Sequence, residues 1–162
     1  MSLTVRAAEP DEWQALRAVR LAALLDAPDA YYSTYEQAAG RTEREWRTWL
    51  GVGGCFLAWL GGEPVGMVRV GPSAATGVGS AEPTGADLVA MWVAPATRGT
   101  GAADALMTAA LDWARDHGYH HVDLEVAPGN VRAERVYARH GFVATGESTS
   151  YKCGLAMRRS FS

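Results

Sequence analysis

The feature that most constrains the fold is the stretch "VAPATRGTGAADAL", from Val93 to Leu106. An apolar run at residues 91–93 is typical of a strand, and this run ends at Pro95. Arg98 and two glycines follow, and then come small residues that favour a helix. Glycine adopts turns that other residues avoid, and the first N–H groups of a helix have no partner within it. A strand, a glycine-rich turn and a helix in this order therefore predict a cradle for a phosphate or diphosphate.

The same residues are also compatible with a tight turn that binds nothing. A P-loop requires a lysine after its second conserved glycine, and none follows here. A dinucleotide-binding fingerprint requires a third glycine at the position where this chain has Asp104. Only about 60 residues follow the loop, which is too few for a doubly wound sheet. These departures argue against an ATP-binding or an NAD-binding domain.

Length and composition favour one globular domain over residues 1–162. The chain is 48% hydrophobic and 20% charged, which suffices to bury a core at this length. Its net charge of -3 argues against nucleic-acid binding, and no apolar run is long enough to span a membrane. The first residues lack the apolar core of a secretory signal, so we expect a cytoplasmic protein.

The cysteines and histidines form no motif. Cys55 and Cys153 are far apart and are expected to be buried thiols. His120 and His121 are adjacent, so on a strand they would point to opposite faces and could not chelate one ion together. We expect no metal site.

Hydrophobic periodicity predicts an α/β (α+β) chain with helices on the faces of a mixed sheet. The expected strands lie near residues 3–7, 55–60, 65–71, 87–95, 120–126, 142–148 and 151–161, and the expected helices near residues 10–27, 42–51, 100–117 and 130–141. Residues 29–40 have few periodic signals and are expected to form a loop. The segment 72–85 is rich in glycine, serine and proline, and is expected to be the most mobile part.

Two features of the predicted helices concern single residues. Arg20 falls among the apolar positions of the first helix. This predicts an arginine that is paired or reaches the rim of the core, with a substrate contact as the alternative. Thr42 and Glu45 have the spacing of a capping box at the start of the second helix.

Two blocks, "VAPATRGTGAA" and "LEVAPGNVRAERVYARHGF", follow one another in the chain. The first resembles the pyrophosphate loop of the GNAT superfamily of acetyl-CoA-dependent N-acetyltransferases, and the second is similar to that family's N-x-x-A-x-x-x-Y-x-x-x-G-F signature. The family's loop is usually Q/R-x-x-G-x-G/A. With Gly99 and Gly101 as the glycines, the first position here is Ala96, whereas a reading from Arg98 places Gly101 and Ala103 at the other positions.

The resemblance implies a GNAT-like mixed central sheet of about six to seven strands flanked by about four helices. It implies acetyl-CoA as co-substrate, no metal, and direct transfer of acetyl to a primary amine of a small molecule or of a peptide or protein N-terminus. A homodimer is common in such folds. The alternative function is a non-catalytic acyl-CoA-binding regulatory module.

The resemblance also implies where the coenzyme binds. Pantetheine would pair with exposed strand backbone, and a backbone N–H there could meet the developing oxyanion. The residues implied are Met91, Trp92 and Val93 on the strand, and Arg98, Gly99, Thr100, Gly101, Ala102 and Ala103 on the loop. Asn130 is a further coenzyme contact or a simple helix N-cap.

Two residues are implied for catalysis. Tyr137 would be the general acid that protonates the leaving thiolate, with a core tyrosine as the alternative. Glu125 lies between apolar neighbours on a strand, where a carboxylate is costly unless it is paired or has a function. The "LEV" run ahead of an asparagine is similar to alanine N-acetyltransferases of ribosomal proteins, so Glu125 is the candidate base, acting through water. A solvent-facing or arginine-paired carboxylate is the alternative.

The acceptor amine is expected to bind near the loop that follows the first helix. Tyr31, Tyr32 and Tyr35 could line this site through cation–π contacts or hydrogen bonds, or could simply pack the loop. Small amines, amino acids, amine antibiotics and protein N-termini all remain open as acceptors.

Overall fold

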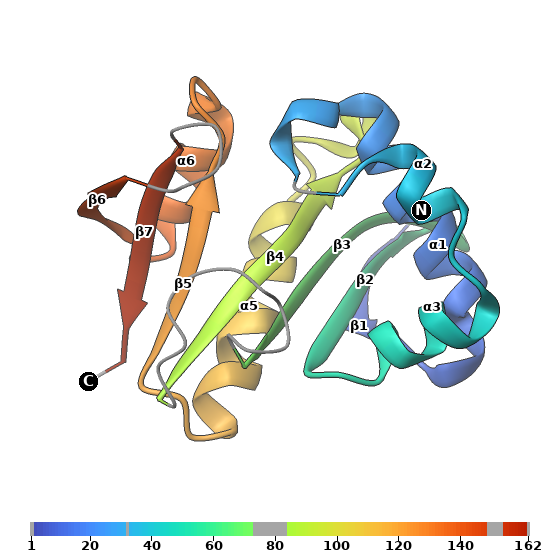
Figure 1. Ribbon diagram of the computed structural model, residues 1–162, viewed down its shortest axis with the longest axis horizontal. Coiled ribbons are helices and arrows are strands. Elements are labelled where there is room, and N and C mark those ends of the chain that lie inside the picture. Colours follow the sequence, from blue (N-terminus) through green and yellow to red (C-terminus); the bar gives the residue numbers. More distant parts are fainter. Residues whose placement is uncertain (1, 32, 73–83, 149–153, 162) are drawn as a thin grey trace.

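One mixed sheet forms the centre of the molecule, with strand order β1-β2-β3-β4-β5-β7-β6 (Figure 1). The computed structural model describes residues 2–31, 33–72, 84–148 and 154–161. The strands are β1 Leu3–Ala7, β2 Gly54–Leu60, β3 Glu63–Pro72, β4 Gly85–Val93, β5 His121–Val126, β6 Val143–Ser148 and β7 Leu155–Ser160. The α-helices are α1 Trp13–Asp26, α2 Tyr35–Ala39, α3 Glu43–Leu50, α5 Ala102–Asp116 and α6 Val131–Arg139. The predicted mixed sheet is confirmed.

The helices cover the two faces of the sheet and divide the core in two (Figure 1). Helix α5 packs across β1 to β5 on one face, while α1 packs on β3 and β4 on the other and carries α2 and α3. Alternate residues of β3 pack into the two cores: Val68 packs on the α5 side, and Met67 packs on the α1 side. The strand period of two dictates this division, because successive side chains point to opposite faces.

The segment 29–40, predicted as a loop, contains a helical turn. Helix α2 forms at Tyr35–Ala39, after a short 3₁₀ turn at Pro28–Ala30. Thr34 and Gln37 stabilise it as a capping box, since each side chain bonds the backbone N–H of the other. The five-residue helix is too short to show helical periodicity, which explains the error.

Two other local predictions are confirmed. Thr42 and Glu45 form the predicted capping box of α3, with hydrogen bonds of 3.1 and 3.2 Å to each other's backbone. The strands predicted near residues 55–60 and 65–71 form as β2 and β3, and Gly61 and Gly62 turn between them with φ of 58° and 84°. Such positive φ angles favour glycine because it has no Cβ.

Cys55 is buried on β2 as predicted, and burial raises the pKa of its thiol to about 11. Cys153 and the segment 73–83, the centre of the expected mobile segment, lie outside the described residues. In the described ranges, no three His, Cys, Asp or Glu side chains are placed to hold a metal ion. None of the described helices has the length and apolar character needed to span a membrane.

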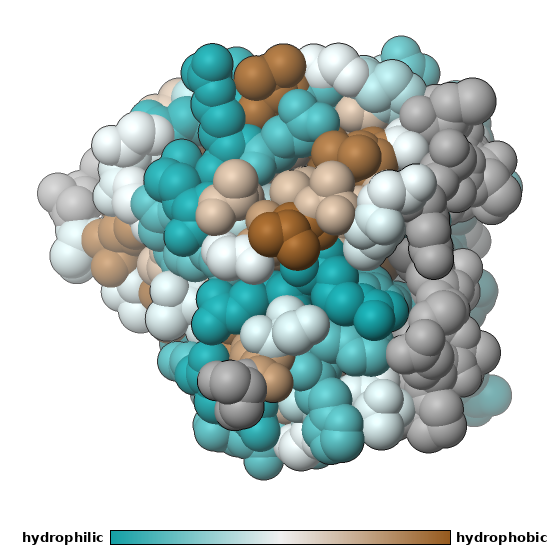
Figure 2. All heavy atoms as spheres, turned by 90° about the vertical axis from the view of Figure 1, so that its left-hand side faces the viewer, coloured by the Kyte–Doolittle hydropathy of each residue, from teal (hydrophilic) through white to brown (hydrophobic). Residues whose placement is uncertain are grey.

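The side of the molecule that carries β6 and β7 is largely hydrophilic, with a few apolar residues among the polar ones (Figure 2). Val131, at the start of α6, and Val143, at the start of β6, are exposed large hydrophobic residues. Scattered exposed apolar residues are normal on a protein surface. The expected homodimer stays a prediction.

Candidate functional site

The parallel strands β4 and β5 separate along their length, and the gap between them positions the site. They pair only where Gly85–Asp87 meets His121–Asp123. On the other side of β4, Val89 pairs with Arg69 and Trp92 with Met67, so β4 has one more residue than β3 in this interval. Ala90 lies in this bulge with φ of 57°. Bulges with strained backbone often redirect a strand at functional sites.

Two adjoining cavities lie at the gap between β4 and β5. One has a volume of about 250 Å³ and extends towards α1 and α3, and the other has about 390 Å³ and extends towards the glycine loop. Both are lined by Tyr31, Met91, Asn130 and Tyr137. A long ligand could therefore run from the loop through the gap to the α1 side.

We call the place where the two cavities meet the junction, and Tyr137 is the buried aromatic residue of α6 there. Its ring packs edge-on against Phe142 with centroids 6.0 Å apart, and the residue is 8% exposed. Burial, with a smaller contribution from nearby Tyr31, raises the pKa of its phenol above the ordinary value. The phenol is therefore protonated at neutral pH, which general-acid chemistry requires.

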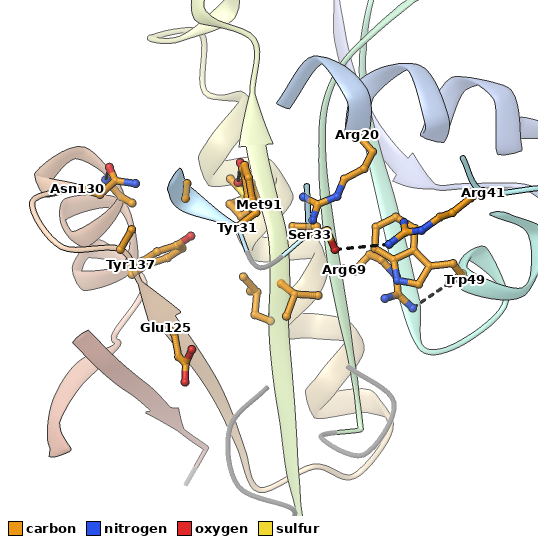
Figure 3. A pocket seen from close by; sticks show the side chains of 16 residues that line it. Arg20, Tyr31, Ser33, Arg41, Trp49, Arg69, Met91, Glu125, Asn130 and Tyr137 are labelled. Carbon is orange, nitrogen blue, oxygen red and sulfur yellow. Dashed lines mark hydrogen bonds between the residues drawn. The ribbon is translucent and has the colours of Figure 1, made fainter. Parts of the chain in front are cut away.

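Glu125 faces the first cavity from β5 (Figure 3). Leu124 and Val126 point into the core with α5, so strand alternation turns Glu125 to the opposite face. Its cross-strand neighbour is Ala156. Asp123, two residues earlier, accepts hydrogen bonds of 2.7 and 3.1 Å from Arg158.

The three tyrosines of the predicted acceptor site have different positions. Tyr31 lies in the junction, where its hydroxyl donates a hydrogen bond of 3.0 Å to the Met91 carbonyl and its ring stacks on Arg20. Burial raises the pKa of Tyr31 to about 12. Tyr35 begins α2, is partly buried against the core cluster that contains α1, and lines neither cavity. Tyr32 lies outside the described residues.

The glycine loop leads from β4 into α5 with left-handed backbone at Gly99 and Gly101, where φ is 83° and 90°. A Cβ added at either position would meet no protein atom within 4 Å. These two positions therefore favour glycine because of their backbone conformation, and not because a neighbouring protein atom excludes a Cβ. Thr100 ties the turn together, because its hydroxyl donates to the Thr97 carbonyl at 2.6 Å.

The loop borders a cationic groove of about 590 Å³ between α5 and α6. Four arginines line it: Arg98, Arg132, Arg135 and Arg139. Asp104, in the first turn of α5, accepts a 2.9 Å hydrogen bond from Arg139 and lies 2.8 Å from His140 Nε2. Hydrogen bonding to His140, and then to Arg139, lowers the pKa of Asp104, so its carboxylate joins the two helices. An anion fits this groove beside the free N–H groups of the α5 N-terminus.

The remaining coenzyme candidates surround the second cavity. Met91, Trp92, Val93, Arg98, Ala103 and Asn130 line it, whereas Ala102 is buried in the core. Asn130 caps α6, because its side-chain oxygen accepts from the Ala133 N–H at 3.3 Å. The same residue also faces both cavities, so the N-cap position leaves its side chain next to the site.

Asp26, at the end of α1, is a residue of this site that sequence reasoning missed. Its Oδ2 accepts hydrogen bonds from Trp92 Nε1 at 3.0 Å and from Arg98 Nη2 at 3.2 Å. No motif surrounds Asp26, and its partners are more than 60 residues away in the sequence. Sequence reasoning also missed Arg41, Trp49 and Arg69, which line the first cavity.

The chain is similar to known acetyltransferases in sequence profile and in fold. The sequence profile of the acetyltransferase (GNAT) family matches residues 21–142. A search of curated proteins finds no match. Among solved structures, an acetyltransferase of the GNAT family from Streptococcus pneumoniae is 21% identical with a TM-score of 0.78, and the alignment covers 99% of this chain and 100% of that chain.

Two further structures share the fold. A Salmonella typhimurium protein solved with its cofactor acetyl-CoA is 16% identical with a TM-score of 0.77, covering 100% of this chain and 95% of that chain. The ribosomal-protein-alanine N-acetyltransferase from Brucella melitensis is 20% identical with a TM-score of 0.72, covering 98% and 99%. The family profile spans most of the sequence and the fold agrees throughout, so this chain belongs to the acetyltransferase (GNAT) family.

Proposed function

We propose that the protein transfers acetyl from acetyl-CoA directly to a primary amine. The observation that carries this proposal is that Tyr137, Glu125 and the end of β4 line the first cavity, at the place where β4 separates from β5. The resemblance to the GNAT family implies that these three parts act in different steps of acetyl transfer. Their meeting in adjoining cavities supports a catalytic site over a module that only binds acyl-CoA.

The coenzyme occupies the cationic groove beside the glycine loop and the gap between β4 and β5. Its diphosphate lies on the N–H groups at Gly99–Ala103, with Arg98 as the charged donor. Pantetheine follows β4 along Met91–Val93 towards the junction. The Met91 carbonyl already accepts one hydrogen bond from Tyr31, and a carbonyl oxygen has a second lone pair for the coenzyme. This places the thioester beside Tyr137.

The proton steps divide between two residues. Glu125, through a water molecule, takes the proton from the acceptor ammonium, so that the neutral amine attacks the thioester carbon. A β4 backbone N–H stabilises the oxyanion of the tetrahedral intermediate. When the C–S bond breaks, the Tyr137 hydroxyl gives its proton to the sulfur. The nitrogen then releases its remaining extra proton, the Tyr137 phenolate regains a proton through water, and the products are the acetylated amine and free CoA.

Free-thiol release tests this proposal directly. The protein is incubated with acetyl-CoA and a panel of small amines, amino acids, aminoglycosides and N-terminal peptides. We expect thiol release with at least one acceptor class, together with the acetylated amine by mass spectrometry. Acetyl-CoA that raises the melting temperature without any turnover across the panel would instead favour the acyl-CoA-binding module.

Glu125→Gln is expected to lower kcat about 10- to 100-fold near neutral pH, because the amine loses the base that neutralises it. The deficit should shrink as the pH approaches the pKa of the acceptor, since the amine then deprotonates without help. Steady-state rates across pH check this result. Glu63→Gln, which changes an exposed residue of the β2–β3 hairpin, is the control. Equal pH–rate profiles for Glu125→Gln and wild type would exclude the role.

Asp26→Asn is expected to tighten acetyl-CoA binding about three- to tenfold at low salt. The substitution removes a negative charge from the cavity wall and releases Arg98 from its 3.2 Å ion pair. Isothermal titration calorimetry at two salt concentrations measures the change, which should decrease at high salt. Asp116→Asn removes the same charge at the far end of α5 and should have no effect. Weaker binding by Asp26→Asn would show that Asp26 instead positions Arg98.

A further inference from the structure

Three arginines converge on the wall of the first cavity that faces α1 and α3 (Figure 3). Arg20 comes from α1, Arg41 from the turn before α3, and Arg69 from β3. All three surround the ring of Trp49, with distances of 5.8, 5.4 and 4.3 Å from each Cζ to the ring centroid. We call these three side chains the arginine wall.

Two members of the arginine wall, Arg20 and Arg69, are buried, and the third, Arg41, is half-buried. Arg20 is 5% exposed and Arg69 2%. Arg69 donates one Nη2 to the Trp49 and Val52 carbonyls, but its Nε and Nη1 have no partner. Arg20 Nε and Nη1 and Arg41 Nη1 are also buried without a hydrogen bond. Among the described residues, no carboxylate forms an ion pair with any of the three.

This arrangement is unfavourable in the free protein. Burial, reinforced by the neighbouring arginines, lowers the pKa of Arg20 and of Arg69 to about 10, so both are still charged at neutral pH. Stacking on Trp49 and Tyr31 compensates only part of the lost hydration. Buried charges normally have an oppositely charged partner, because an unpaired one is strongly destabilising. An anion in the cavity would supply that partner.

The cavity has opposite charge on its other side. Glu125 is the one carboxylate among the described residues that line it. Figure 3 shows Glu125 across β4 from the arginine wall, on the same side as Tyr137 and Asn130. The amine must react near Glu125 and Tyr137, so an acceptor that fills the cavity places its other end against the arginines.

We propose that the acceptor is a small zwitterion of the amino-acid type, whose amine lies towards Glu125 and whose carboxylate binds the arginine wall. This inference rests on the proposed acetyl transfer. Guanidinium groups match carboxylates in shape as well as charge, and Ser33, 3.5 Å from Arg41, adds a hydroxyl donor to the same wall. In a protein N-terminus the α-carboxylate is part of a peptide bond, so a neutral N-terminal residue leaves the arginines unpaired.

Matched acceptor pairs test the inference. Each of the common amino acids is compared with its own carboxamide, which keeps the amine and side chain but lacks the negative charge, and both are compared with neutral peptides. We expect kcat/KM for the best amino acid to exceed that of its carboxamide about 30-fold or more. Equal rates for acid and amide, or a preference for peptides, would overturn the inference and leave acetyl transfer intact.

A binding experiment separates the two proposals when turnover is absent. N-acetyl amino acids and N-acetyl amino acid carboxamides are titrated calorimetrically into the CoA-loaded protein, which needs no catalysis. Preferential binding of the acids supports the arginine wall as an anion site. Equal binding, or no binding of either series, contradicts it.

Arg20→Met tests the wall itself, because Arg20 forms no hydrogen bond or ion pair with the described residues. We expect kcat/KM for the amino acid to fall about tenfold or more, with no change for the carboxamide. Arg44→Met, on the exposed side of α3, removes the same charge as a control. If Arg20→Met fails to fold, Arg41→Met gives the same test at a half-buried position. A folded variant that slows acid and amide equally would assign these arginines a structural role only.

Discussion

Gly101→Glu is expected to weaken acetyl-CoA binding by at least about 100-fold. Gly101 has φ of 90° at the start of α5, and no protein atom lies within 4 Å of an added Cβ. The glutamate side chain would therefore enter the groove lined by Arg98, where the diphosphate is proposed to bind, and its charge would repel that anion. Isothermal titration calorimetry with acetyl-CoA measures the loss.

The matched control for this substitution lies at the other end of the same helix. Gly118 has φ of 82° and equally open surroundings. Gly118→Glu thus imposes similar backbone strain and adds the same charge, but about 25 Å away along α5. We expect it to retain wild-type affinity. Unchanged acetyl-CoA affinity in Gly101→Glu would show that the loop does not hold the coenzyme.

Tyr137→Phe is expected to lower kcat about 100-fold while the Kd for acetyl-CoA stays the same. The substitution removes only the hydroxyl, and the ring keeps its edge-on contact with Phe142. Because burial raises the pKa of this phenol, the wild-type group still carries its proton at neutral pH and can give it to the thiolate. Steady-state kinetics and calorimetry together separate turnover from binding.

Tyr119→Phe serves as the control for loss of a hydroxyl. Tyr119 stacks on Trp113, on the face of the sheet that α5 covers, and lines neither cavity at the junction. We expect its turnover to match the wild type. If Tyr137→Phe also retains full turnover, then Tyr137 is a packing residue and another group protonates the sulfur.

Much of the fold is encoded locally and was therefore predictable. The β2–β3 hairpin, the α3 capping box and the stop of α5 before Gly118 each depend on residues a few positions apart. Within one element, periods of two and 3.6 residues tell which side chains share a face. On α6, the same helical period turns Tyr137 inward, where it is buried. Helix α2 was not predicted, because a helix of about one turn is too short to show a period.

The two motif blocks were sufficient to indicate the family, but not the surroundings of its site. Gly99 and Gly101 could be recognised because only glycine readily takes their backbone conformation. The bulge at Ala90 could not be recognised from the sequence, since it depends on how β4 pairs with β3. The same holds for the hydrogen bond between Tyr31 and Met91, which are 60 residues apart.

The sequence by itself thus indicated the order of the elements other than α2, and the glycine loop, because each depends on neighbours in the chain. The two candidate catalytic residues came from the resemblance to the GNAT family. Only the tertiary structure decided which other residues line the cavities around the glycine loop and the candidate catalytic residues. It placed Asp26 against Arg98, and it gathered Arg20, Arg41 and Arg69 around Trp49. Helical periodicity placed Arg20 among apolar positions, but it named no partner for this residue. The three arginines meet because α1, the turn before α3, and β3 pack together, and no periodicity within one element encodes that contact.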